Sequence, residues 1–245
     1  SDDSKFFNEF IGLKLPYFYE DKHRAIQINL PIKYHKQSLK YKDWNRKNSI
    51  QLKKINDNFY LTFFYEKEFI VKKKNKQLGI DVGYNKLIST SDNKTYGAEL
   101  KEIYNQISKK KQGSNNFKRA LIHRADKINE IINNINFQNI SNLYVEDLKS
   151  LYQKTKLSSK VMNKLQRFTY RQVLNKLQSA SEEQGILLEK VSPAYTSQTC
   201  SNCQTIDKNN RQSEIYECNN CTIILDADIN AAKNILHRGM YSSSN

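Results

Sequence analysis

Hydrophobic and polar positions alternate with a period of two in the first third of the chain, a pattern typical of strands. The alternation is clear at residues 25–30, and two further runs at residues 50–55 and 59–65 flank the turn-forming sequence Asn56-Asp-Asn58. We therefore expect about three strands between residues 24 and 71, too few to close a barrel. The lysine-rich residues 72–76 are expected to form a solvated connector.

A different pattern begins at Gln77 and predicts strands mixed with helices. Short apolar runs predict an antiparallel meander of strands at residues 78–83, 86–90 and 95–99. A helical period over residues 100–135, broken at residues 112–116, predicts two helices. The remaining pattern predicts a strand at residues 142–148, a helix at 158–184 that begins near Ser158 or Ser159 and stops at Gly185, a strand at 186–191 and a helix at 228–236. This order predicts an α/β sheet with helices on its faces.

All four cysteines lie in two Cys-x-x-Cys pairs, Cys200 with Cys203 and Cys218 with Cys221. Each such turn directs two sulfurs at one point, so the four thiolates are expected to close a tetrahedral zinc site. Two disulfides would use the same number of cysteines, but nothing else in the sequence is typical of a secreted protein. Reduced cysteines fit a cytoplasmic protein, or a nuclear one if the source is eukaryotic.

The chain is strongly basic, with 40 Lys and Arg against 25 Asp and Glu and a formal net charge of +15. Such an excess favours a polyanionic partner, and nucleic acid is the first candidate. A membrane surface is the competing partner. It is disfavoured because no apolar run approaches the ~18 residues of a membrane span and no signal peptide opens the chain.

Three acids stand at positions where a sheet of this order gathers its functional groups. Asp81 ends the first strand of the second pattern, Glu146 ends the fourth, and Asp228 opens the last helix. If the first and fourth strands are neighbours, both strand ends and the helix start meet at one edge of the sheet. One acid at a strand end usually caps a loop. Three acids together favour Mg²⁺ or Mn²⁺, and a pair of such ions hydrolyses phosphodiesters.

Four motifs together resemble the TnpB/OrfB family of transposon-encoded RNA-guided DNA nucleases, which are related to type V CRISPR effectors and to Fanzor proteins. The motifs are Gly79-Ile-Asp81-Val-Gly83, Tyr144-Val-Glu146-Asp-Leu148, Tyr195-Thr-Ser-Gln-Thr-Cys-Ser-Asn-Cys203 and Asp226-Ala-Asp228-Ile-Asn-Ala-Ala-Lys-Asn-Ile235. The last block is highly specific, whereas the first two are short. The resemblance covers most of the chain from about residue 25.

The resemblance implies an α/β fold: an RNase H-like (RuvC) domain with an inserted zinc ribbon, preceded by a partial β-rich wedge-like module. The expected wedge occupies residues 1–75 and the first part of the RuvC-like domain residues 76–195. The zinc ribbon follows at residues 196–224, the final RuvC-like helix at 225–240 and a disordered tail at 241–245.

The resemblance also implies roles for individual residues. Asp81 would hold both catalytic Mg²⁺ or Mn²⁺ ions, Glu146 would hold one and help to orient water, and Asp228 would complete the site. Asp226 is the second choice for the third acid. Asn230 is expected to be an ordinary first-turn residue of the last helix, although a polar contact at the site is the alternative.

A nucleic-acid contact is expected from two groups of residues, in the basic helical region and before the first cysteine pair. The alternatives are a solvated helix face for the first group and packing of the cysteine turn for the second. The candidates are Lys109, Lys110, Lys111, Lys118, Arg119, Arg124, Tyr195 and Gln198.

Two departures from the family pattern change the expectations. Only about seventy-five residues precede Leu78, where relatives usually carry a recognition lobe and a complete wedge, so guide anchoring is in doubt and a homodimer would compensate. Gln204 and Thr222 follow the cysteine pairs where many relatives have glycine. A side chain is accommodated at these positions if φ stays negative, so the zinc site is still expected.

The leading hypothesis is an RNA-guided DNA endonuclease with a guide RNA and a target DNA as partners. A non-cleaving, RNA-bound DNA-binding repressor or accessory subunit is the first alternative, and the retention of all three acids argues against it. A transposase that joins DNA without RNA is the second, and a zinc ribbon before the third acid fits it poorly.

Overall fold

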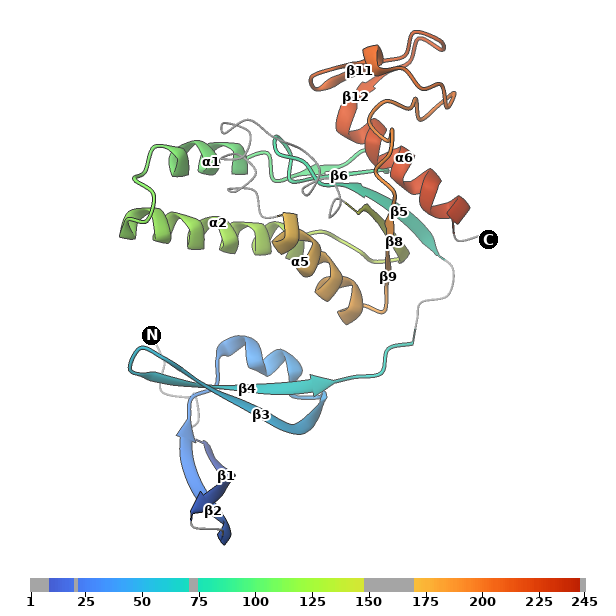
Figure 1. Cartoon of the computed structure of the whole chain (residues 1–245). Coiled ribbons are helices and arrows are strands. Elements are labelled where there is room, and N and C mark those ends of the chain that lie inside the picture. Colours follow the sequence, from blue (N-terminus) through green and yellow to red (C-terminus); the bar gives the residue numbers. More distant parts are fainter. Residues whose placement is uncertain (1–8, 20–21, 71–74, 148–169, 243–245) are drawn as a thin grey trace. The chain divides into compact units, whose positions relative to one another are not determined.

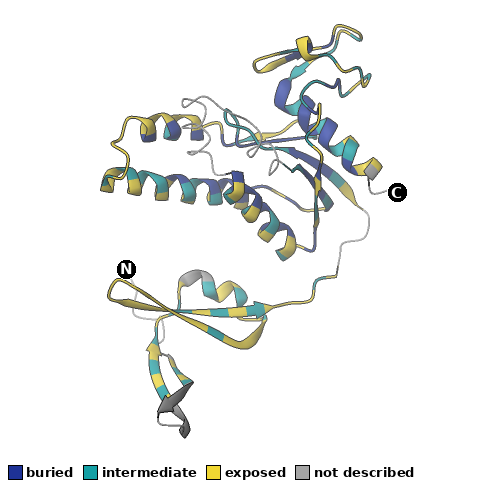
Figure 2. Cartoon of the chain, in the orientation of Figure 1, coloured by how far each residue is buried: buried dark blue, intermediate teal, exposed yellow. Residues whose placement is uncertain are grey.

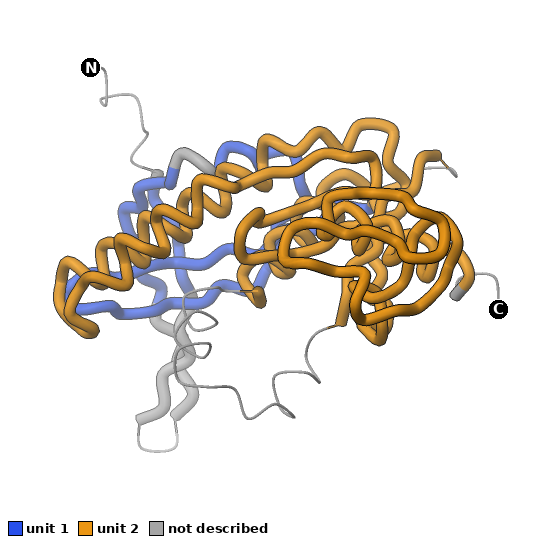
Figure 3. The backbone as a smooth tube through the Cα atoms, turned by 90° about the horizontal axis from the view of Figure 1, so that it is seen from above, with its two compact units in different colours: residues 1–68 blue, residues 69–245 orange. Residues whose placement is uncertain are grey.

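The computed structural model describes residues 9–19, 22–70, 75–147 and 170–242. The chain divides into two compact units, Ser1–Glu68 and Phe69–Asn245, coloured separately in Figure 3. Each unit is built from its own set of strands, and the expected acid and cysteine sites all lie in the second. Among the described residues, no helix is both long and apolar enough to cross a membrane.

The first unit consists of two separate antiparallel hairpins and a short 3-10 helix, η2 (Lys36–Tyr41). One hairpin pairs β1 (Glu9–Tyr19) with β2 (Lys22–Ile32), and the other pairs β3 (Asn45–Ile55) with β4 (Asn58–Glu66). Strands β2, β3 and β4 confirm the predicted runs. β1 has no predicted counterpart, and its Gly12 and Pro16 are residues that weaken a strand pattern.

The turn between β3 and β4 is shorter than the sequence predicts. Ile55 pairs directly with Asn58, so Asn56 and Asp57 alone form the turn, and Asn56 has a φ of 52°. A positive φ suits the two-residue hairpin turns, in which asparagine is favoured. The predicted hairpin is therefore correct, with a tighter turn.

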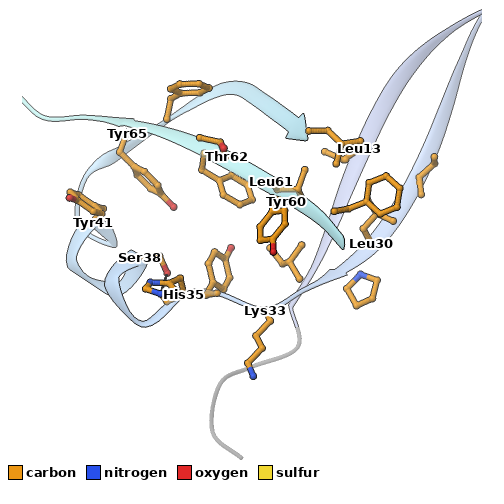
Figure 4. A pocket seen from close by; sticks show the side chains of 18 of the residues that line it. Leu13, Leu30, Lys33, His35, Ser38, Tyr41, Tyr60, Leu61, Thr62 and Tyr65 are labelled. Atoms are coloured by element: carbon orange, nitrogen blue, oxygen red, sulfur yellow. Dashed lines mark hydrogen bonds between the residues drawn. The ribbon is translucent and has the colours of Figure 1, made fainter. Parts of the chain in front are cut away.

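Aromatic side chains line a cavity of about 1250 Å³ in the first unit. Figure 4 shows Tyr41, Tyr60 and Tyr65 around it, together with Leu13 and Leu30 from the β1–β2 hairpin. Much of the rest of β3 and β4 is exposed (Figure 2). The first unit therefore has a small apolar centre, and its β3–β4 hairpin is largely solvated.

The second unit is organised around a five-stranded sheet of order β7-β6-β5-β8-β9. The antiparallel part confirms the predicted meander, and the parallel part places the first and fourth predicted strands side by side. β8 pairs in parallel with both β5 and β9. The strands are β5 (Lys76–Asp81), β6 (Ile88–Thr90), β7 (Thr95–Tyr96), β8 (Ile140–Glu146) and β9 (Leu187–Val191).

Helices cover both faces of this sheet (Figure 1). Leu78 and Ile80 of β5 and Leu143 of β8 pack in the main core with residues of α1 (Leu100–Ser108), α2 (Asn115–Asn133) and α5 (Tyr170–Glu183). The alternate residue Tyr144 packs with Ile235 of α6 (Ala227–Ser242) in a separate cluster. The layers are therefore α1, α2 and α5, then the sheet, then α6.

The predicted helices agree with these elements where the structure describes them. α1 ends before the predicted break and α2 begins within it, at Asn115. The Ser114 side chain caps α2 by accepting from the Phe117 amide at 3.1 Å. α5 matches the second half of the predicted helix, whereas Ser158 and Ser159 lie outside the described residues. Gly185, the predicted stop, has a φ of +67°.

Two glycines allow α6 to lie close against the sheet. A Cβ at Gly79 of β5 would come within 2.2 Å of the Ala232 carbonyl oxygen, and a Cβ at Gly239 of α6 would come within 2.1 Å of the Tyr144 ring. Because these contacts are with backbone and with a buried ring, neither position has room for a side chain. Gly79 belongs to the same motif as Asp81, so α6 packs closely on β5 only two residues away from this acid.

The cysteine-bearing segment forms a small unit of its own between β9 and α6. A short helix, η3 (Lys208–Asn210), precedes a three-stranded antiparallel sheet of β10 (Arg211–Gln212), β11 (Ile215–Glu217) and β12 (Ile224–Asp226). Its core consists of Cys200, Cys218, Tyr216 and Ala227. β12 continues directly into α6, so this segment and the last helix are one continuous piece of structure.

Candidate active site and cysteine cluster

Asp81 and Glu146 end neighbouring parallel strands. Ile80 of β5 lies opposite Val145 of β8, so the next residue on each strand is one of the two acids. Since side chains alternate across a strand, the two acids share the sheet face of Gly79 and Tyr144, which is the face that α6 covers. The topology therefore directs both carboxylates toward the start of α6.

The main chain and side chain of Glu146 are both held. The Tyr170 hydroxyl of α5 donates to the Glu146 carbonyl oxygen, and the next amide, of Asp147, donates to the Val191 carbonyl at 2.8 Å. The Thr196 hydroxyl donates to Glu146 Oε1. These contacts fix the strand end and the direction of its carboxylate.

Asp228 lies in the first turn of α6 and is buried. Its Oδ2 is 3.9 Å from the position of a Cβ built at Gly83, so the carboxylate reaches the loop that follows Asp81. Asp226 is engaged differently. It caps α6 by accepting from the Asp228 and Ile229 amides at 3.0 and 3.1 Å, and it pairs with Lys86. This capping role favours Asp228 as the third acid.

The three acids interact electrostatically. Burial, followed by the charges of Glu146 and Asp228, raises the pKa of Asp81 to about 8. Burial also raises the pKa of Glu146, against the hydrogen bond from Thr196 and the charges of Arg238 and Arg211. Repulsion of this kind among acids is what a divalent cation relieves.

Arg211 of β10 supplies a positive charge at this site. Its Nη2 lies 2.9 Å from Asp228 Oδ1, and its charge opposes the raised pKa of Asp81. Within the described residues, the four cysteines form a group close enough to hold a metal ion, whereas the three carboxylates do not form such a group. Because Arg211 contacts Asp228 and acts on the pKa of Asp81, its side chain belongs to the acid site. No pattern in the sequence predicts this role.

The four cysteine sulfurs form a compact cluster. All lie within 4.8 Å of one another, and the Cys200–Cys221 and Cys203–Cys218 sulfurs are 3.6 Å apart. Tetrahedral Zn–S bonds of about 2.3 Å place sulfurs roughly 3.8 Å apart, so the cluster has the size of a zinc site. The residues present thus fit the metal that their spacing predicts.

Two similar turns present these sulfurs. The Gln204 amide donates to the Cys200 carbonyl, and the Thr222 amide donates to the Cys218 carbonyl, each at 2.9 Å. Asparagine amides cross between the turns, from Asn202 to the Cys221 sulfur and from Asn220 to the Cys203 sulfur, each at 3.5 Å. The Asn220 amide is the main cause that lowers the pKa of the Cys203 thiol to about 5. The pKa of the Cys221 thiol is lowered as well, so the contacts favour thiolate, the form that binds a metal, at these two residues. Burial has the opposite effect at Cys200 and raises the pKa of its thiol to about 12.

Comparison with known proteins agrees with this arrangement. The sequence model of the family "Cas12f1-like, TNB domain" matches residues 170–235. The CRISPR-associated endodeoxyribonuclease Cas12f1 of Sulfoacidibacillus thermotolerans is 44% identical over 72 residues, which are 29% of this chain and 17% of that protein. A TnpB-like protein of Acanthamoeba polyphaga mimivirus is 36% identical over 96 residues, which are 38% of this chain and 18% of that protein.

Over part of its length the chain is similar to Cas12f1 nucleases and to TnpB-like proteins. A solved structure of a Cas12f1–sgRNA–target DNA complex has a TM-score of 0.51 and 18% identity, and the match covers 95% of this chain and 66% of that one. This likeness shows a shared mixed α/β fold. The sequence matches span less than a fifth of the length of these two curated relatives.

The turns of this TnpB-like chain correct one prediction. Gln204 has a φ of 62° and Thr222 a φ of 58°, so the negative φ that would accommodate a side chain is found at neither position. The amide of each residue closes its cysteine turn, and the closed turn puts that residue in the left-handed region. Left-handed backbone favours glycine and is unfavourable for a β-branched residue such as Thr222.

Buried asparagines of α6 attach the cysteine segment to the acid site of the TnpB-like fold. Asn230 donates to the Thr199 carbonyl at 2.8 Å and accepts from the Ser201 amide at 2.9 Å. Asn234, one turn later, donates to the carbonyls of Thr196 and Thr199 at 2.9 and 2.6 Å. Asn230 thus has a tertiary role beyond that of a first-turn residue, and its four-residue spacing from Asn234 is the signal in the sequence.

The candidate nucleic-acid residues are placed unequally. Lys109, Lys110 and Lys111 are exposed in the α1–α2 connection, and Lys118 and Arg119 are exposed in the first turns of α2. Arg124 is 6% exposed in α2, and burial lowers its pKa. The expectation that Arg124 belongs to an exposed basic face is therefore wrong, because its position on α2 faces inward with Ile128.

The two candidates before the first cysteine pair also differ from each other. Tyr195 is 58% exposed and has a φ of 60°. Gln198 is half-buried, and its carbonyl accepts from the Tyr216 hydroxyl at 3.3 Å and from the Asp207 amide at 3.1 Å. Tyr195 is thus exposed, whereas the main chain of Gln198 braces the cysteine segment.

Proposed function

We propose that the chain is an RNA-guided DNA endonuclease that hydrolyses phosphodiester bonds of guide-complementary DNA. The observation that carries the proposal is the meeting of Asp81, Glu146 and Asp228 at one end of the sheet in a TnpB-like chain. In this proposal the five-stranded sheet with its helices is an RuvC-like domain, and the cysteine segment is a zinc ribbon.

The three acids are the proposed ligands of two Mg²⁺ or Mn²⁺ ions, with Asp81 shared between them. When bound, such ions activate a water and stabilise the leaving oxygen. Asp81 has a pKa near 8 and must release its proton to become a ligand, so ion binding and proton release are linked. Thr196 and Tyr170 hold Glu146, and the cap from Asp226 holds the start of α6 that carries Asp228.

The cysteine segment is proposed to bind a structural zinc through Cys200, Cys203, Cys218 and Cys221. The sulfur distances support this, and the contacts from Asn230 and Asn234 link the segment to α6. The zinc would then keep in place the strand that carries Arg211 and the helix that carries Asp228.

A guide RNA and a target DNA are the proposed partners. The net charge of +15 supports them, as do the exposed side chains of Lys109, Lys110, Lys111, Lys118, Arg119 and Tyr195. Arg124 is left out because it is buried. A homodimer remains part of the proposal.

The test is to purify the chain with its co-purifying RNA, sequence that RNA, and offer DNA that matches it together with Mg²⁺. Cleavage of matched but not scrambled DNA is expected, and Asp81→Ala and Glu146→Ala should each abolish it. Cleavage that survives either substitution contradicts the assignment of the acids. Binding of matched DNA without cleavage in Mg²⁺ or Mn²⁺ supports the non-cleaving alternative instead.

A further inference from the structure

Thr196 contacts one of the three acids without being an acid itself. It follows β9 in the loop that leads to the first cysteine pair, and it is 2% exposed. Its hydroxyl contacts Glu146 Oε1, and the next contact of that hydroxyl is the Pro193 carbonyl at 3.2 Å. Since a hydroxyl has one proton to donate, the closer carboxylate is its principal acceptor.

The main chain of Thr196 is held from the opposite side. Asn234 of α6 donates to its carbonyl at 2.9 Å, and α6 carries Asp228 in its first turn. The same asparagine and Asn230 hold the Thr199 carbonyl, so several hydrogen bonds fix the loop on α6. Thr196 therefore connects two elements of the acid site: its hydroxyl binds Glu146 at the end of β8, and its carbonyl binds Asn234 of α6.

We infer that Thr196 is a positioning residue that holds the Glu146 carboxylate in the orientation needed to bind a divalent ion beside Asp81 and Asp228. The inference rests on the proposed function. One oxygen of Glu146 receives the threonine hydroxyl, which leaves the other oxygen, and the remaining lone pairs, to the ion. Residues that orient metal ligands in this way contribute strongly to metal affinity.

The experiment measures the affinity of the full chain for Mn²⁺ alone, by electron paramagnetic resonance of the free ion. Thr196→Val keeps the shape and removes the hydroxyl, and it should weaken Mn²⁺ binding by roughly 10- to 100-fold. Thr196→Ser restores the hydroxyl and should restore most of the affinity. Thr199→Val is the matched control. It removes another buried hydroxyl of the same loop, one that donates to the Tyr195 carbonyl at 2.8 Å, and Mn²⁺ affinity should not change.

A double-mutant cycle separates positioning from folding. If Thr196 acts through Glu146, then Thr196→Val should have little further effect on Mn²⁺ affinity in a Glu146→Gln background. Equal effects in both backgrounds, or unchanged affinity in Thr196→Val, overturn the inference while the proposed function stands. If the unaltered chain binds no Mn²⁺ at all, the proposed function fails and this inference fails with it. Zinc content and the unfolding midpoint, measured on every variant, identify any loss of Mn²⁺ affinity that is caused by misfolding. If Thr196→Val misfolds, the Mn²⁺ affinity of Thr196→Ser is compared with that of Thr199→Val instead.

Discussion

Asp81 carries a carboxyl group whose pKa lies far above its ordinary value. Because the pKa is near 8 in the folded protein and near 3.8 without these surroundings, the folded protein holds an extra proton between about pH 4 and pH 8. Its free energy of unfolding must therefore fall as the pH rises through this window. Glu146 has a raised pKa as well and acts in the same direction.

Asp81→Asn, which resembles the protonated acid, should remove most of this pH dependence. Without added Mg²⁺ or Mn²⁺, the variant and the unaltered chain should unfold alike near pH 4. At pH 8 the variant should be more stable by on the order of a few kcal/mol. Urea unfolding across this pH range measures the difference. Added Mn²⁺ should stabilise the unaltered chain more at pH 8 than at pH 5, since protons compete with the ion. Parallel pH curves for the two proteins would contradict the raised pKa.

Thr222 is a β-branched residue in a backbone conformation that favours glycine. Its φ of 58° strains a β-branched side chain, and its exposed side chain bonds only to the neighbouring carbonyl of Cys221 within the described structure. Thr222→Gly should therefore raise the stability of the zinc-loaded chain by about 1 kcal/mol in urea unfolding. Lys208→Gly, at an exposed position without a positive φ, should lower it by roughly 0.5–1 kcal/mol. A destabilised Thr222→Gly protein would show that the threonine fits its turn.

At the scale of elements, patterns close together in the sequence are predicted well. The break between α1 and α2 and the meander of β5, β6 and β7 follow from local periodicity, and the pairing of β5 with β8 follows from where two acids end their strands. The contacts of Arg211 with Asp228 and of Thr196 with Glu146 do not follow from periodicity. The sequence around each of these residues does not indicate which distant residue it contacts. The two partners come together only when the chain is folded.

The position of α6 on the sheet can be tested by a substitution that adds a single methyl group. Gly79→Ala places a Cβ against the Ala232 and Leu236 backbone, so α6 must move away from β5. We expect a loss of about 1–3 kcal/mol in unfolding free energy, and weaker Mn²⁺ binding because Asp228 moves with the helix.

Gly113→Ala is the matched control for this substitution. Nothing lies within 4 Å of its Cβ position, so only its φ of +82° opposes the change. The cost should be about 1 kcal/mol, with Mn²⁺ affinity unaltered. If Gly79→Ala lowers stability but leaves Mn²⁺ affinity intact, the third acid does not depend on the close approach of α6.

At the scale of the whole molecule, the excess positive charge gives a measurable signature of the proposed polyanionic partner. Each lysine that neutralises a phosphate releases counterions, so the slope of log affinity against log salt counts such contacts. Lys109, Lys110 and Lys111 lie side by side and are exposed, and they have no ion pair among the described residues. They are thus well suited to a contact that depends on charge alone.

Replacing these three lysines by glutamine should reduce the slope for a DNA duplex of arbitrary sequence by roughly 2–3, because each contact contributes about 0.7–0.9. Replacement by arginine, which keeps the charge, should leave the slope unchanged. Fluorescence anisotropy at several salt concentrations gives both slopes. A glutamine variant with the original slope would place the bound phosphates elsewhere on the chain. A reduced slope with matched cleavage retained would separate general attraction to nucleic acid from the chemistry at Asp81, Glu146 and Asp228.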